Sequence, residues 1–170
     1  SLMKLLLLVG LFLSCCSSTE QHAAGPCTND ATQKNDYTNF QLRHLAPAER
    51  NDSVAWWRDY MKNNELCGRI DQQTFIHSTI DVVNKICSRD GGYLWKNNLC
   101  ISKAKFTVTV VTSPKHDNEC MNITVEQRDF IYVAVKCENV KLNKDVKCVP
   151  VHFHEMLKKL PNTKMNGCVK

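Results

Sequence analysis

Several motifs that would assign a function directly are missing from this 170-residue chain. It contains no C-x-x-C pair and no H-E-x-x-H segment, the ligand spacings typical of structural zinc sites and zinc proteases. It also has no internal repeat, no low-complexity tract and no apolar run long enough to span a bilayer. These absences argue against a zinc protein, a repeat protein and an integral membrane protein.

The composition is that of a folded domain. Hydrophobic residues make up 43% and charged residues 23% of the chain, which argues against a disordered, collagen-like or coiled-coil protein. The length fits one domain. Lys and Arg exceed Asp and Glu by 22 to 17, and the formal net charge of +5 gives a modest preference for polyanionic partners.

The N-terminus has the order of a secretory signal peptide. Lys4 precedes an apolar run at residues 5–13, and small residues follow at 14–18. We therefore predict a signal peptide over residues 1–18 and a secreted, extracellular protein.

The cysteines agree with an oxidising compartment. Cys15 and Cys16 would leave with the signal peptide, and an even number would remain. We expect these to form a disulfide framework whose pairing the spacing alone does not select. Asn51 and Asn122 begin N-x-S/T triplets and are candidate glycosylation sites. The remaining cysteines are Cys27, Cys67, Cys87, Cys100, Cys120, Cys137, Cys148 and Cys168.

The first half of the sequence predicts helices. Residues 19–35 are small and polar with a Gly-Pro break, typical of a flexible arm. Helices are predicted over 39–45, over 54–63 after a serine N-cap, and up to residue 86 after a Ser-Thr pair. The aromatic residues of the second helix are expected to pack in the core.

The second half predicts strands. β-branched residues with period-two alternation indicate strands at 106–112, 130–136 and 146–153. A loop at 114–118 and a polar turn at 141–144 separate them. Helices followed by antiparallel strands indicate an α+β domain stapled by disulfides.

Six histidines offer acid–base chemistry. Two histidines that meet on a basic surface can cleave a phosphodiester, because imidazole can accept a proton at one step and return one at another. For any single histidine, a side chain without a catalytic role is the more frequent case. The histidines are His22, His44, His77, His116, His152 and His154.

Four short segments narrow the function. They are residues 40–45 (FQLRHL), 74–79 (TFIHST), 84–87 (NKIC) and 148–153 (CVPVHF). Together and in this order they resemble the pancreatic-type ribonuclease (ribonuclease A) superfamily, most closely its amphibian secreted members. The resemblance covers residues 36–153 and leaves 154–170 as a basic C-terminal extension. It implies three short N-terminal helices packed on a long, bent antiparallel β-sheet.

The resemblance implies a role for each site residue. His44 matches the general base that removes the 2′-hydroxyl proton of RNA, and His152 the general acid that protonates the leaving 5′-oxygen. Thr74 matches the residue that recognises a pyrimidine, and Phe153 the one packed beside that base; otherwise both are ordinary strand or core residues. Arg43 is expected beside the phosphate, or as a solvated side chain on the helix. Because DNA lacks the 2′-hydroxyl, single-stranded RNA is the expected substrate, with no metal or cofactor.

One position departs from the resemblance. The family has a lysine directly after the cysteine that matches Cys67, where it stabilises negative charge in the transition state. Counting forward from Cys67 places Gly68 there, and counting back from the Thr-Phe pair places Ile70 there. Arg69, between them, is the substitute cation, although its guanidinium is wider than an ammonium. Loss of such a donor lowers a rate by roughly 10²–10³-fold, so we expect weak ribonuclease activity, or none.

The resemblance also implies two disulfide bridges common to the family, Cys67–Cys120 and Cys87–Cys137. For the other four cysteines we expect Cys148–Cys168 and Cys27–Cys100. The interval between Cys137 and His152 is longer than the family usually has, so we predict an extended last hairpin.

The sequence therefore predicts a secreted, pyrimidine-preferring endoribonuclease that cleaves RNA through a 2′,3′-cyclic phosphate. The alternative is a non-catalytic cationic protein on the same scaffold, acting in host defence or signalling, that binds RNA, glycans or membranes. The paired histidines favour the first, and the missing lysine favours the second. We expect a monomer that binds single-stranded RNA, with an anionic cell surface or glycans as further candidate partners.

Overall fold

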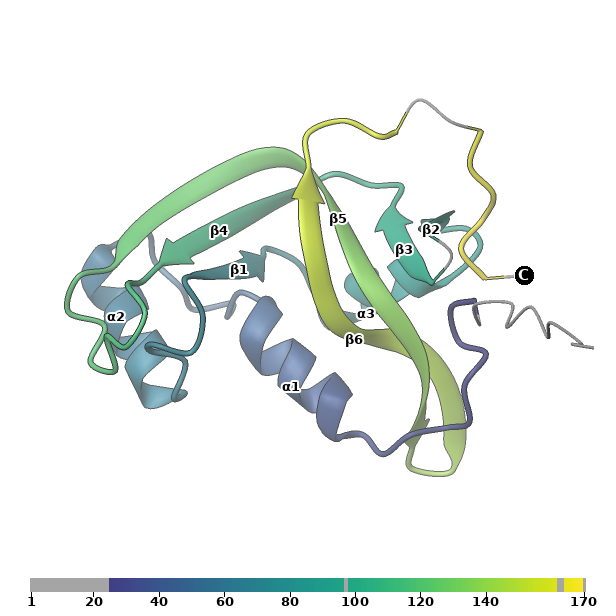
Figure 1. The fold of residues 1–170 in the computed structure, drawn as a ribbon, viewed down its shortest axis with the longest axis horizontal. Helices are drawn as coiled ribbons and strands as arrows, with labels where there is room; N and C mark the ends of the chain where they lie inside the picture. Colours follow the sequence, from purple (N-terminus) through teal and green to yellow (C-terminus); the bar gives the residue numbers. More distant parts are fainter. Residues whose placement is uncertain (1–24, 97, 162–163, 170) are drawn as a thin grey trace, which may run out of the picture.

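The structure is a computed structural model that describes residues 25–96, 98–161 and 164–169. The predicted signal peptide, residues 1–18, and the first part of the predicted arm lie outside the described residues. Three helices and a six-stranded antiparallel sheet form an α+β fold (Figure 1), which confirms the predicted fold class. No helix in the described part of the chain is long and apolar enough to cross a membrane.

Three short helices lie where the sequence predicts them. α1 spans Asn35–His44 and begins earlier than predicted. α2 spans Val54–Asn63 as predicted, and the Ser53 side chain accepts a hydrogen bond from the first helical turn at 3.2 Å, as an N-cap should. α3 spans Ile80–Asn84 and continues as a 3₁₀ turn, Lys85–Cys87.

The strands form one sheet in the order β1-β4-β5-β3-β2, with β6 also paired to β5. β5 changes partner along its length: residues 124–131 pair with β4, and residues 132–142 pair with β6. Figure 1 shows that the sheet bends along this strand. The bounds are β1 Gln72–Ile76, β2 Gly92–Trp95, β3 Leu99–Ser102, β4 Phe106–Thr112, β5 Thr124–Leu142 and β6 Asp145–Leu157.

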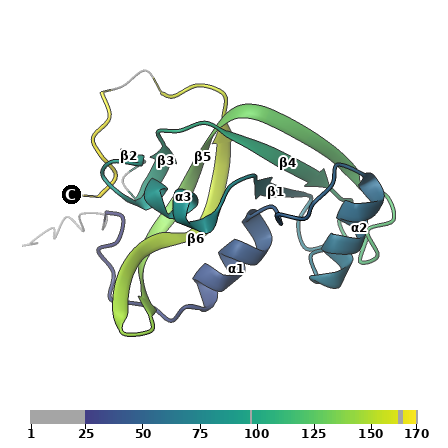
Figure 2. The ribbon, with the colours of Figure 1, turned by 180° about the vertical axis from the view of Figure 1, so that it is seen from behind.

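The bend divides the molecule into two lobes. The β4 lobe contains α2, β1 and β4, the β6 lobe contains α3, β2, β3 and β6, and β5 is shared. α1 contacts both β1 and β6, so it lies between the lobes (Figure 2). In the β4 lobe, Trp57 and Met61 of α2 are buried in one cluster with Phe75, which confirms the expected core role of that helix. In the β6 lobe, Val83 and Val135 share a core with the cysteines of three disulfides.

The strand predictions are confirmed in part. Residues 106–112 form β4 as predicted. β5 begins at Thr124, before the predicted residue 130. The sequence pattern misses this start because residues 124–129 are mostly exposed and polar and lack a buried apolar face. β5 and β6 pair as far as Leu142 and Asp145, which confirms the extended last hairpin. β6 continues past the predicted end at residue 153, and β1, β2 and β3 are absent from the sequence prediction.

Four disulfides connect the described cysteines. Cys67–Cys120 and Cys87–Cys137 confirm the two bridges implied by the resemblance. The expected pairs Cys148–Cys168 and Cys27–Cys100 are wrong. The structure has Cys27–Cys148 and Cys100–Cys168 instead.

Backbone and side-chain hydrogen bonds explain the pairing of Cys27. Its N–H donates to the Cys137 carbonyl at 3.2 Å, and the Asn139 side chain donates to the Cys27 carbonyl at 2.9 Å. Asn139 pairs with Cys148 across β5 and β6, so Cys27 is held beside Cys148. Residues 25–34 are therefore tied to the last hairpin, in contrast to the predicted flexible arm.

The end of the chain is fixed in a similar way. The Cys168 N–H donates to the Gly92 carbonyl at 2.9 Å, and Gly167 forms a bridge with Tyr93 of β2. Because β2 pairs with β3, this contact places Cys168 beside Cys100. Part of the predicted basic extension thus adds to the edge of the sheet.

Candidate active site

His44, the last residue of α1, is buried and oriented by a backbone group. It is 9% exposed, and its Nδ1 lies 3.0 Å from the Thr74 carbonyl oxygen of β1. Since a carbonyl only accepts, Nδ1 carries the proton and Nε2 keeps a lone pair. Burial, aided by nearby cationic side chains and opposed by the Thr74 hydrogen bond, lowers the pKa of His44 to about 4. His44 is therefore neutral near pH 7, as a general base must be.

His152 comes from the β6 lobe, whereas His44 lies on α1 between the lobes. His152 lies on β6, paired with Lys136 of β5, and it is exposed. Partial burial lowers the pKa of His152, and the positive charges of His154, Lys136 and Arg69 lower it further. No described residue donates or accepts a hydrogen bond that would orient its ring.

Both histidines line one open cleft of about 890 Å³, which α1, β1 and β6 border. His152 also contributes to the lowered pKa of His44, as expected for two imidazoles that share a cleft. The structure thus brings together all the catalytic and substrate-binding residues named from the sequence. These are His44, His152, Arg43, Arg69, Thr74 and Phe153.

Arg69 lies on the loop before β1 and is held by a buried glutamine. Its Nη2 donates to Oε1 of Gln73 at 2.8 Å, and the Gln73 amide donates to the Arg43 carbonyl. Gln73 is fully buried, so its side chain positions the guanidinium at the cleft. The charge of Arg69 contributes to the lowered pKa of both His44 and His152.

The structure places the two positions at which the family lysine is expected, Gly68 and Ile70, in different surroundings. Gly68 has φ of +64°, and a Cβ there would lie 2.5 Å from Oδ1 of Asn118, so a side chain at this position is strained and crowded. Gly68 does not line the cleft, whereas Ile70 does. Of the two positions, Ile70 is the one at the cleft, next to Arg69, which also lines it.

Arg43 and Arg69 form a cationic patch in the cleft. Neither has a carboxylate within 4.0 Å among the described residues, whereas Lys136 pairs with Glu138. Nε of Arg43 is buried and has no hydrogen-bond partner in the described part of the chain. Because both arginines line the cleft without a described carboxylate partner, this patch is suited to an anion such as a phosphate.

The cleft also has an apolar part. Thr74 is 4% exposed, and its Oγ1 lies 3.9 Å from Sδ of Met156. The Phe153 ring stacks on His44 with centroids 5.0 Å apart and planes at 16°. Aromatic faces beside polar groups are the usual means of holding an unpaired nucleobase.

Sequence reasoning missed Lys136 and Met156, which line the cleft, and Gln73, which is buried and holds Arg69. Gln73 directly precedes the recognised TFIHST segment, and this position is the one signal that could have drawn attention to it. Lys136 reaches the cleft through the register between β5 and β6. Met156 lies beyond the predicted end of its strand.

The other predicted sites lie away from the cleft. Asn51 and Asn122 are exposed, which leaves both accessible to glycosylation. His77 is part of a separate hydrogen-bond group, with Nε2 2.7 Å from Oγ1 of Thr109 and Nδ1 3.0 Å from Arg50. His22 lies outside the described residues.

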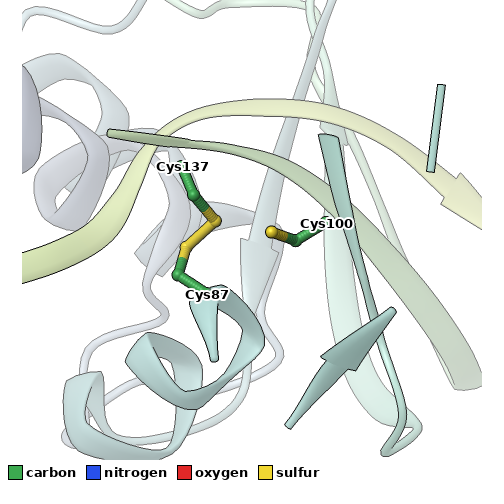
Figure 3. A group of neighbouring side chains, drawn as sticks. All are labelled: Cys87, Cys100 and Cys137. Carbon is green, nitrogen blue, oxygen red and sulfur yellow. A yellow bond between two sulfur atoms is a disulfide. The ribbon is translucent and has the colours of Figure 1, made fainter. Parts of the chain in front are cut away.

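Three sulfur atoms form a group in the core of the β6 lobe. Those of Cys87, Cys100 and Cys137 lie within 4.8 Å of one another (Figure 3). All three are disulfide-bonded, and Cys100 is joined to Cys168. They therefore offer no thiolate to a metal ion.

The fold and the cleft define a disulfide-stapled α+β protein. Two histidines, one on the helix between the lobes and one in the β6 lobe, line one cleft beside a cationic patch, an arrangement suited to phosphodiester chemistry. Residues 35–154 match the sequence profile of one family, pancreatic ribonuclease. The chain belongs to this family.

Known relatives agree with this membership. Angiogenin-1 of Bos taurus is 29% identical over 122 residues, covering 70% of this chain and 76% of the relative. Green turtle egg white ribonuclease has a TM-score of 0.57 at 18% identity, covering 72% of this chain and 98% of that chain. Zebrafish RNase5 has a TM-score of 0.54 at 22% identity, with coverages of 71% and 93%. The two structures show the same fold, and family membership supports a ribonuclease-type function with RNA as substrate or binding partner.

Proposed function

We propose that this protein is a secreted endoribonuclease that cleaves single-stranded RNA on the 3′ side of pyrimidines. The observation that carries the proposal is that His44 and His152 line one cleft beside two arginines without carboxylate partners. Members of the family are typically secreted, which agrees with the signal peptide predicted from the sequence.

The histidines divide the proton transfers. Nε2 of neutral His44 accepts the 2′-hydroxyl proton, and the 2′-oxygen attacks the adjacent phosphorus. Protonated His152 donates a proton to the departing 5′-oxygen, which leaves a 2′,3′-cyclic phosphate on the first product. Water then opens the cyclic phosphate with the two roles exchanged.

The remaining cleft residues bind the substrate. Arg43 and Arg69 are the donors available to the phosphate oxygens, and a guanidinium offers parallel N–H groups to such an anion. Thr74 and Phe153 hold the base. Because Ile70 occupies the place where the family lysine is expected, charge stabilisation depends on Arg69 and the activity is weak.

The second candidate is a non-catalytic cationic protein that binds RNA, glycans or membranes through the same surface. One observation favours it: no described group orients His152, and partial burial together with the surrounding cations lowers its pKa. A histidine that is mostly neutral near pH 7 is a poor general acid.

Release of cyclic phosphate from a uridine-adenosine dinucleotide tests the proposal. His152→Ala is expected to lower the rate by roughly 10²–10⁴-fold, whereas His116→Ala, at an exposed histidine that does not line the cleft, is the control that retains activity. Ile70→Lys is expected to raise the rate at least about tenfold, because it adds an ammonium at the cleft. Equal rates for wild type and His152→Ala would exclude the nuclease and leave the binding protein.

A further inference from the structure

Phe130 is the most exposed large apolar side chain of the described residues, at 74%. It lies in a bulge of β5, where Asp129 and Phe130 together stand opposite Thr107 of β4. Its φ is +59°, a value that a bulky L residue rarely adopts. Strain of this kind persists where the surrounding structure imposes it, and it is frequent at functional sites.

Local hydrogen bonds impose this conformation. Oγ1 of Thr107 donates to Oδ1 of Asp129 at 2.6 Å, and the Gln127 side chain donates to the same oxygen at 3.4 Å. The bulge is therefore fixed on both strands, while the adjacent Phe130 ring remains open to solvent.

The exposed ring adjoins the candidate active site. Phe130 borders a depression of about 580 Å³. Arg128, Ile131 and Lys158 line both this depression and the cleft, so the two are adjacent. Thr74 of β1 pairs with Val110 of β4, and Val110 pairs with Glu126 of β5, which lines the depression. This register places the depression on the Thr74 side of the cleft.

Two lysines give the depression its cationic character. Nζ of Lys105 lies 5.9 Å from the centroid of Phe130, within the range of a cation–π contact. Lys158 contributes a second ammonium. Arg128 is bound by both Glu126 carboxylate oxygens, at 2.9 and 2.7 Å. An open aromatic face with adjacent cations is the arrangement that binds single-stranded nucleic acid without strong sequence preference.

We propose that Phe130 stacks the base on the 5′ side of the nucleotide whose base is held at Thr74. The proposal rests on the proposed function, in which the scissile phosphate follows that nucleotide on its 3′ side. The strand must then leave the Thr74 pocket in the 5′ direction, and the Phe130 depression adjoins the pocket. The site takes any base, because every base has a face that can stack.

The same surface fits a membrane less well. A single aromatic ring buries little area in a bilayer, and membrane binding strengthens with the apolar area that is buried. RNA requires one exposed face, which Phe130 provides.

Binding of non-cleavable oligonucleotides tests the subsite. The probes contain 2′-O-methyl uridine followed by adenosine, either as the dinucleotide, with a 5′ adenosine added, or with a 5′ abasic unit added. Phe130→Ala is expected to weaken binding of the adenosine-extended probe at least about fivefold, with the other two probes unchanged. Phe130→Tyr keeps the ring and should retain affinity. Met121→Ala, at another exposed apolar residue outside the cleft, is the matched control.

Thermal unfolding of each variant confirms that it is folded. Equal affinity of wild type and Phe130→Ala for the extended probe would overturn the subsite. So would a loss that is the same for all three probes, or a loss confined to anionic phosphatidylserine vesicles. If the probes bind as expected but cleavable RNA remains intact, the nuclease fails and the subsite stands. If cleavable RNA is cut but Phe130→Ala does not change probe binding, the nuclease stands and the subsite fails.

Discussion

The two lobes reach stability by different means although they share β5. In the described chain the β4 lobe has one disulfide, Cys67–Cys120, and an aromatic cluster in which Trp57 lies 4.8 Å from Phe75 and 5.9 Å from Tyr60 between ring centroids. The β6 lobe has three disulfides, and their cysteines lie in or against a core that also includes residues of β1 and β4. The buried area of large aromatic side chains stabilises the β4 lobe. The β6 lobe is stabilised by disulfides, two of which join it to the described chain ends.

The lobes also differ in how firmly they hold the side chains of the cleft. On the β4 side, Thr74 orients His44 and Gln73 positions Arg69 through hydrogen bonds. On the β6 side, His152 is exposed, and no described residue holds its ring. One half of the cleft is preorganised, and the other half depends on substrate to orient it.

The largest effect is expected from Trp57→Ala. The side chain is fully buried in the aromatic cluster, so its removal should cost about 3–5 kcal/mol in the free energy of unfolding, measured in urea. Trp57→Phe is the control, because it keeps the ring contacts and removes an indole N–H that has no described partner. A loss below about 1 kcal/mol for Trp57→Ala would show that packing does not hold this lobe.

The second-largest effect is expected from removal of the Cys100–Cys168 disulfide of the β6 lobe. Removing Cys100 and Cys168 together should cost about 2–4 kcal/mol. Cys168→Ala alone should be worse, because it leaves the Cys100 thiol within 4.8 Å of the Cys87 and Cys137 sulfurs (Figure 3), where thiolate attack can exchange the bridge. Peptide mapping should show mixed disulfides in the single variant and Cys87–Cys137 in the double variant. Identical maps would contradict the exchange.

Arg69→Ala tests whether the preorganised half provides the charge stabilisation. We expect kcat/KM for the dinucleotide to fall by roughly 10²-fold, about 2.7 kcal/mol, because one donor to the phosphate is lost. Lys144→Ala, in the exposed turn of the last hairpin, removes the same charge away from the cleft and should change little. Similar losses in both variants would mean that net charge, not position, matters.

The smallest effect concerns pH. Neutral His44 is required, so kcat/KM should rise with pH through about 4; protonated His152 is required, so it should fall as pH rises through a pKa below 6.5. The optimum should thus lie on the acidic side of 6.5. His154→Ala removes a nearby charge that lowers the His152 pKa, and it should move the alkaline limb to higher pH. If the alkaline limb of kcat/KM does not move in His154→Ala, the titration of a group other than His152 causes that limb.

Much of the fold follows from local pattern. The alternation at residues 106–112 and the serine cap before α2 each define an element without tertiary information. β5 does not, because its first residues are polar and exposed and become a strand through pairing with β4. The partners of Cys27 and Cys168 depend on where the chain ends lie against the sheet, which spacing cannot specify.

The residues of the candidate site also fall into two groups, those that the sequence predicts and those that only the structure places. His44, Thr74 and His152 lie in recognisable segments, so the sequence predicts all three. The place of Arg69 depends on the left-handed turn at Gly68 and on buried Gln73. Both are tertiary features, which the local sequence pattern does not specify.

The Cys27–Cys148 bridge has a consequence for the integrity of the cleft. α1 carries His44 and is continuous with Cys27, while Cys148 lies on the strand that carries His152. Proteolysis of the link between α1 and α2 would therefore leave the two fragments covalently joined. The N-terminal helix would be kept from diffusing away, or from exchanging into a second molecule, by a tether anchored close to its partner histidine.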